Sequence, residues 1–217
     1  GILKKLWNNV QYHEPSSSIV SIDIRENSFV SVSESGRTVE WNANVSGITP
    51  SFKMMQEQSL STLKERFQSI NKPLYTFTVL KSACHHTTNQ LVAIALVQHT
   101  DNDWCLYCIK SLGLDYQLEH VVPLNRFVAP RAVQVYDLKF ADNGLSYISF
   151  DQSVMMAVYK DQIYEFNVNA TLLPFSMQAD VVTHGVVLIA ANGTEYRACY
   201  RVDTALRNTG IANDFDI

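Results

Sequence analysis

The most reactive side chains of this 217-residue chain are four cysteines, at positions 84, 105, 108 and 199. Cys105 and Cys108 form a C-x-x-C pair, a spacing used by zinc and redox sites. The sequence has no second C-x-x-C for zinc, and no helix follows that would lower a thiol pKa. The pair lies in an alternating segment that predicts a strand, where side chains three apart point to opposite faces. We therefore interpret these cysteines as structural.

A second group, Cys84-His85-His86, contains residue types that bind metals. Adjacent side chains diverge, however, and residues 82–89 are polar enough to predict a loop. We therefore expect an exposed loop with no metal. The alternative, a metal site, would take its remaining ligand from His99, His120 or Cys108.

The segment "SFVSVSESGRTVEWNANV", residues 28–45, predicts a hairpin that turns at Gly36. Its turn resembles the aspartate box of sialidase-type propellers, but Ser35 occupies the acidic position and Trp41 comes one residue late. A glycosidase also needs paired carboxylates in a pocket, whereas the acidic residues here fall mostly in turns. A Gly-flanked serine elbow and a phosphate-binding loop are absent from the sequence. We expect no catalytic residue, no cofactor, no metal and no small-molecule substrate.

Four hairpins of similar form predict the architecture. Each pairs a Val/Ile/Ala strand with an aromatic-rich strand, and the turns fall at Gly36, at residues 100–103, at residues 160–162 and at Asn192-Gly193. Their spacing of several tens of residues is typical of β-propeller blades. We therefore predict an all-β fold, a single domain over residues 1–217 formed by part of a β-propeller. A β-sandwich is the alternative.

One segment departs from this pattern. Thr49 and Pro50 suit the start of a helix, and Pro73 follows its end, which predicts an amphipathic helix inserted at residues 49–70. We expect this helix to dock on the propeller side, or to face a partner or a membrane. The apolar face of the predicted helix consists of Phe52, Met55, Leu60, Leu63, Phe67 and Ile70.

Composition limits the classes of partner. The chain is 47% hydrophobic and 18% charged, with a formal net charge of −4, so we expect no direct contact with nucleic acid. The apolar runs are too short to span a bilayer, and the start has no secretory signal pattern. We expect an intracellular protein whose sequons at Asn44, Asn169 and Asn192 are not glycosylated. Because the first residue is not Met, we also expect a fragment or a processed product.

The order of elements resembles the propeller of an outer-ring nucleoporin, the hundred-and-thirty-three-kilodalton subunit at the stem tip of the Y-shaped complex. The motifs are "GILKKLW" at residues 1–7, a strand pair closing on "VEWNANV", and a segment like "LSTLKERFQSI". The later segments "LVAIALVQHTDNDWCLYCI" and "SVMMAVYKDQIYEFNV" resemble its later blades. Inner-ring nucleoporins and vesicle-coat propellers share this plan.

The resemblance implies the C-terminal half of a seven-bladed propeller, about four blades, followed in the family by a helical stack. It implies a structural scaffold of the nuclear pore at the nuclear envelope, which supports mRNA export and protein import. The implied partners are other outer-ring nucleoporins and the envelope membrane. A generic propeller of a vesicle-coat or trafficking complex is the alternative, and a propeller hydrolase is a third hypothesis.

Overall fold

The computed structural model describes residues 17–25, 28–44, 51–59, 74–100, 103–112, 115–124, 133–150, 155–160, 162–166, 175–182, 185–198 and 200–202. Within these residues the chain forms sixteen strands and no helix. The paired strands are antiparallel throughout and belong to four separate sheets. The predicted all-β class is therefore confirmed.

Each sheet is built from strands that follow one another in the sequence, except that the last strand of the chain joins the third sheet, and we call the sheets blades 1 to 4. Blade 1 contains β1 (Ile19–Ile24), β2 (Ser28–Ser33), β3 (Arg37–Asn44) and β4 (Ser51–Ser59). Blade 2 contains β5 (Thr76–Cys84), β6 (Leu91–Thr100), β7 (Asp103–Leu112) and β8 (Asp115–Pro123). Blade 3 contains β9 (Gln134–Ala141), β10 (Gly144–Phe150), β11 (Met155–Tyr159) and β12 (Gln162–Phe166). Blade 4 contains β13 (Phe175–Ala179), β14 (Val186–Ala190) and β15 (Glu195–Arg197), and β16 (Tyr200–Val202) pairs with β12 of blade 3.

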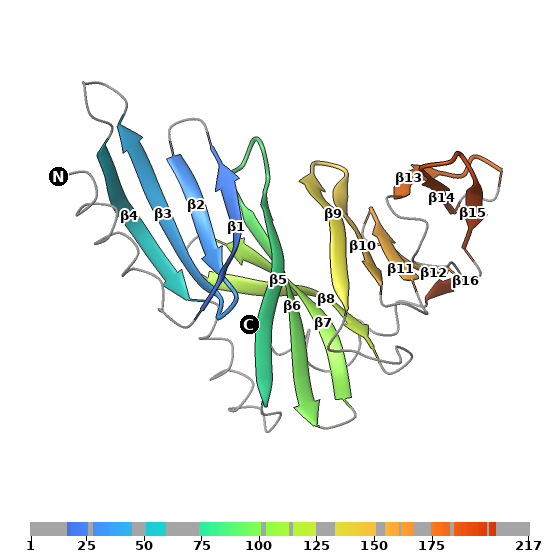
Figure 1. Ribbon diagram of the computed structural model, residues 1–217, viewed down its shortest axis with the longest axis horizontal. Helices are drawn as coiled ribbons and strands as arrows, with labels where there is room; N and C mark the ends of the chain where they lie inside the picture. The colour runs from blue at the N-terminus through green and yellow to red at the C-terminus, as the bar shows by residue number, and fades with distance from the viewer. Residues whose placement is uncertain are drawn as a thin grey trace.

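The blades stand in a row in sequence order (Figure 1). The first strand of each of the first two blades lies beside the first strand of the next, since β1 contacts β5 and β5 contacts β9. First strands gathered along one line, with the later strands spreading outward, are the arrangement of propeller blades around an axis. The chain thus forms part of a β-propeller, as the hairpin spacing predicted.

Blade 2 is buried on both faces because β6 and β7 alternate their side chains between two cores. The odd-numbered residues of both strands face blade 1 and pack with Val30 and Val32. The even-numbered residues face blade 3 and pack with Val135 and Tyr147. A third core joins blade 3 to blade 4 around Phe166 and Leu188. Near-continuous apolar runs in the middle strands are therefore the sequence signature of a blade packed on both sides.

The predicted hairpins all form. Gly36 and Gly193 have φ values of 91° and 86°, a backbone conformation that glycine adopts without steric strain. β6 pairs with β7 across residues 100–103, and β11 pairs with β12 across Lys160. Phe29 stacks on Trp41 across the first hairpin, with ring centroids 6.0 Å apart.

The predicted helix at residues 49–70 is wrong over its first half. Ser51–Ser59 form β4, which pairs with β3 along its length and contains a bulge at Met55, while Phe52 lies opposite Ala43. Sheet pairing overrides local helix propensity here, because β3 offers a full row of backbone groups and a short isolated helix is marginal. Leu60, Leu63, Phe67 and Ile70 lie outside the described residues. Where the structure describes the chain, no helix has the length and apolar character needed to cross a membrane.

Candidate functional site

The loop between β5 and β6, residues 85–90, belongs to blade 2 and contacts both blade 1 and blade 3. Two backbone hydrogen bonds close it, from His85 N to the Gln90 carbonyl (2.7 Å) and from Asn89 N to the His85 carbonyl (3.0 Å). Asn89 has a φ of 56°, in the left-handed region that asparagine tolerates better than most residues. This compact loop presents the Asn89 carbonyl toward blade 1 and the His85 imidazole toward blade 3.

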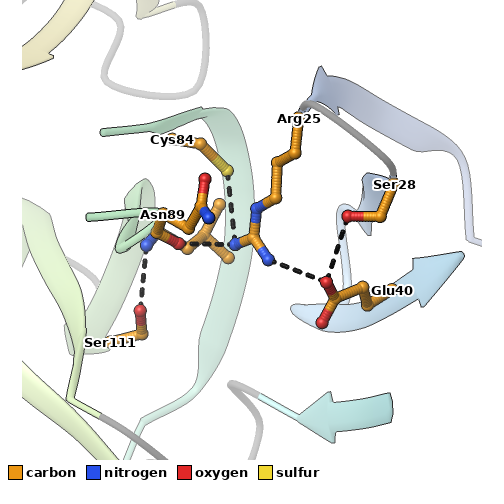
Figure 2. Close-up of polar contacts among 7 residues, drawn as sticks. Arg25, Ser28, Glu40, Cys84, Asn89 and Ser111 are labelled. Atoms are coloured by element: carbon orange, nitrogen blue, oxygen red, sulfur yellow. Dashed lines mark hydrogen bonds and ion pairs between the residues drawn. The ribbon is translucent and has the colours of Figure 1, made fainter. Parts of the chain in front are cut away.

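On the side of blade 1, Arg25 reaches across from the end of β1 (Figure 2). Its guanidinium donates to the Glu40 carboxylate (3.1 Å) and to the Asn89 carbonyl oxygen. It also contacts the sulfur of Cys84 at 3.7 Å. Ser28 donates a further hydrogen bond to Glu40 (3.2 Å). The Arg25 and Glu40 side chains are only 15% and 23% exposed, so this ion pair within blade 1 is shielded from bulk water. Arg25 joins blade 1 to blade 2 through its contacts with Asn89 and Cys84.

A second group of polar contacts joins the same two blades beside Arg25. The Ser82 hydroxyl donates to the Asp23 carboxylate (2.8 Å), and the Ser82 backbone N–H donates to the Ser21 hydroxyl (2.9 Å). The Val79 backbone N–H donates to the Glu34 carbonyl at 2.8 Å. The junction between blades 1 and 2 is therefore apolar in its core and hydrogen-bonded along its edge. We call the polar edge of a junction between two blades its margin.

Burial controls the titration of this margin. It raises the pKa of Asp23 above its ordinary value, against the smaller opposing effects of the Ser82 hydrogen bond and Arg25. Burial is also the main reason why the pKa of Cys84 is raised, and the nearby Asp23 charge adds to it. Cys84 is thus a protonated thiol at neutral pH, which is not the state of a reactive cysteine.

On the side of blade 3, His85 Nε2 lies 2.9 Å from the Asp142 carboxylate. His85 Nδ1 accepts from the backbone N–H groups of Thr87 and Thr88, both at 3.2 Å. Since backbone N–H groups only donate, Nδ1 has no proton, and the neutral ring bears its proton on Nε2, which donates to Asp142. The His85 ring also meets the Phe140 ring edge-on at 5.1 Å.

Blades 2 and 3 leave a pocket of about 320 Å³ between them, and two residues that contact His85, Phe140 and Asp142, line it. The Lys110 ammonium lies 3.4 Å from the Glu119 carboxylate and 5.3 Å from the centre of the Phe140 ring. Glu119 is the extra residue of a β-bulge, because Cys108 pairs with His120 and Ile109 with Leu118. The pocket is lined by Val92, Cys108, Lys110, Glu119, Phe140, Ala141, Asp142, Asn143, Gly144 and Leu145.

The structure separates the residues that the sequence offered as metal or redox ligands. Cys84 packs toward blade 1 and His85 toward blade 3, so their side chains diverge as predicted. Cys105 and Cys108 lie in opposite cores of blade 2 as buried thiols that form no disulfide. No group of three metal-binding side chains occurs in the described part of the chain. The expectation that His85 is exposed is wrong, because its ring is inserted between the blades and the residue is only 4% exposed.

Sequence reasoning missed four residues of this region: Arg25, Lys110, Glu119 and Asp142. A signal existed for Asp142, since Ala141-Asp142-Asn143-Gly144 has turn composition and Gly144 has a φ of 109°. Nothing local indicates the bulge at Glu119 or the partner of Arg25, which is 64 residues away at Asn89. These contacts depend on how the blades stack.

Comparison with known proteins gives a similarity of fold. No family model and no curated protein matches the sequence. Among solved structures, the β-propeller domain of Nup133 from Vanderwaltozyma polyspora is similar, with a TM-score of 0.52 and 11% sequence identity. The similarity covers 86% of this chain and 56% of that one, so the chain spans little more than half the length of the domain. At this identity, the similarity shows a shared propeller-type fold and nothing finer.

Proposed function

We propose that this chain is part of a structural scaffold propeller in the outer ring of the nuclear pore complex, at the nuclear envelope. The observation that supports the proposal is the similarity of its consecutive blades to a Nup133 β-propeller domain. In this role the chain supports mRNA export and protein import through protein contacts, with no chemistry of its own.

The mechanism is the presentation of surfaces by a rigid frame. Apolar cores and margin hydrogen bonds hold neighbouring blades in a fixed relation, so their loops keep fixed positions for partners. The proposed partners are other nucleoporins of the outer ring and the envelope membrane. The apolar residues Leu60, Leu63, Phe67 and Ile70 stay a prediction for a partner-facing or membrane-facing segment.

Localisation of the full-length protein tests this proposal. A fluorescently tagged copy, expressed from its own promoter, should form a punctate ring at the nuclear rim and coincide with a pore marker. The matched control replaces the fully buried Leu106 with Asp, which places an unpaired charge in the blade core and should abolish the rim signal. Vesicular puncta without rim signal would contradict the nuclear pore assignment and favour a vesicle-coat or trafficking propeller.

A further inference from the structure

The pocket between blades 2 and 3 has an apolar floor and a charged rim. Val92, Cys108 and Leu145 are each at most 3% exposed and form the floor. The rim holds Lys110 and Glu119 from blade 2 on one side, and the β9–β10 turn with Asp142 on the other. Its volume of about 320 Å³ is at the small end for ligand pockets, which suits one long side chain better than a nucleotide.

The charges of the lining favour a cation. Two carboxylates, Glu119 and Asp142, oppose the single ammonium of Lys110, which leaves one net negative charge. His85 adds no positive charge, because its Nδ1 is occupied as an acceptor of backbone N–H groups. Lys110 is already paired with Glu119 and lies over the Phe140 ring, so its charge is compensated within the pocket.

Asp142 is the most accessible of these groups. Its side chain is 78% exposed, and it receives one hydrogen bond from His85, whereas a carboxylate has about four acceptor positions. The hairpin turn that bears it is fixed by Gly144 at positive φ and by the β9–β10 pairing on either side. The carboxylate therefore stands at the pocket mouth in a defined orientation, with acceptor positions beyond the one used by His85.

We propose that this pocket binds the guanidinium of an arginine side chain from a partner polypeptide. A guanidinium matches carboxylates with two parallel donors and is less strongly hydrated than an ammonium, so it loses less on entering a pocket. Its aliphatic stem would lie on the apolar floor, as long cationic side chains do at interfaces. The formal charge of −4 on the chain also favours the approach of a basic segment. This inference is independent of the complex to which the chain belongs, and its failure would leave the proposed function standing.

The test is a chemical-shift titration of the isotope-labelled protein with N-acetyl-arginine methylamide. The expected result is a saturable shift of the Asn143 and Gly144 amides. The citrulline analogue, which has the same shape without the charge, should bind at least about tenfold more weakly. Inorganic phosphate should leave both amides unmoved, because the rim carboxylates repel an anion.

Three variants connect the shifts to the pocket. Asp142→Asn and Glu119→Gln should each weaken arginine binding by about three- to tenfold, the effect of losing one charged hydrogen-bond partner. Glu195→Gln removes an exposed acid of blade 4 and should bind like the parent protein. Asp142→Asn changes an exposed turn residue and keeps the test valid if Glu119→Gln unfolds. Equal binding of citrulline, unchanged binding in Asp142→Asn, a phosphate-induced shift of these amides, or no shift with arginine would each overturn the proposal.

Discussion

The two faces of blade 2 are made by the same four strands, but the polar contacts at their junctions with blades 1 and 3 differ. Toward blade 1, the margin is formed by partly buried polar groups: Arg25 of blade 1 contacts Glu40 of its own blade and Asn89 of blade 2. Toward blade 3, the corresponding contact is His85 with Asp142, whose carboxylate is largely in water above an open pocket. Both junctions rest on equally buried apolar cores.

This difference separates two uses of polar residues in one architecture. Where charges are shielded from water and compensated within the protein, they fix how two blades are stacked. Where a carboxylate stays in solvent above a pocket, it adds little to stability and remains available to a ligand. The cores should therefore respond alike to mutation, and the margins should not.

The largest effect is expected in the two cores. Ile94 and Ile109 are each at most 1% exposed, Ile94 toward blade 3 and Ile109 toward blade 1. Replacing either with Ala should lower the free energy of unfolding by about 2–5 kcal/mol, from lost burial and the cavity left behind. Urea unfolding of both variants checks this, with the exposed Val182→Ala as the control. A loss of unfolding free energy in only one of the two variants would contradict the expectation that both cores stabilise the protein alike.

The next effect should come from the margin toward blade 1. Arg25→Ala leaves Glu40 partly buried without its guanidinium partner and should cost about 1–3 kcal/mol of unfolding free energy. Asp142→Ala removes a mostly exposed partner of His85 and should cost less than about 1 kcal/mol. Thermal unfolding of both variants at low and high salt gives the comparison, and equal costs would remove the distinction between the margins.

A smaller effect should come from the loop between the margins. His85→Phe keeps a ring beside Phe140 but deprives the Thr87 and Thr88 N–H groups of their acceptor, at a cost of about 1 kcal/mol. His85→Asn supplies a side-chain oxygen that accepts from the backbone two residues on, and should recover part of this loss. Hydrogen exchange of the Thr87 and Thr88 amides measures the opening of the loop directly. Equal exchange rates in both variants would mean that the contacts with His85 Nδ1 do not stabilise the loop.

The smallest effect concerns Asp23. Because burial raises the pKa of this carboxyl in the folded protein, the folded state binds the proton more tightly than the unfolded chain. The contribution of Asp23 to stability therefore falls as pH rises from the ordinary value of 3.8 through the raised one. Asp23→Asn keeps an acceptor for Ser82 and should stabilise the protein at neutral pH by no more than about 0.5 kcal/mol. The gain should vanish below pH 3.8, and a loss of stability at every pH would contradict this interpretation.

The sequence was informative where a pattern is local. Alternation predicted the strands, Gly36 and Asn192-Gly193 marked their turns, and the spacing of Cys105 and Cys108 predicted opposite faces. The prediction failed at Ser51–Ser59, which has a helical sequence pattern but forms a strand because it pairs with the edge of β3. The contact between Arg25 and Asn89 and the bulge at Glu119 were not predictable locally, because each depends on residues distant in the chain or on strand register.

Two double-mutant cycles, measured on one protein under the same conditions, test most directly whether the two margins of blade 2 differ. The cycle of Arg25→Ala with Glu40→Ala concerns the ion pair of blade 1 whose guanidinium also donates to Asn89 of blade 2. It should give a coupling free energy of about 1–2 kcal/mol, because that pair is shielded from water. The cycle of His85→Ala with Asp142→Ala should give less than about 0.5 kcal/mol, because Asp142 is exposed. Equal couplings, or a stronger coupling on the side of blade 3, would contradict the account.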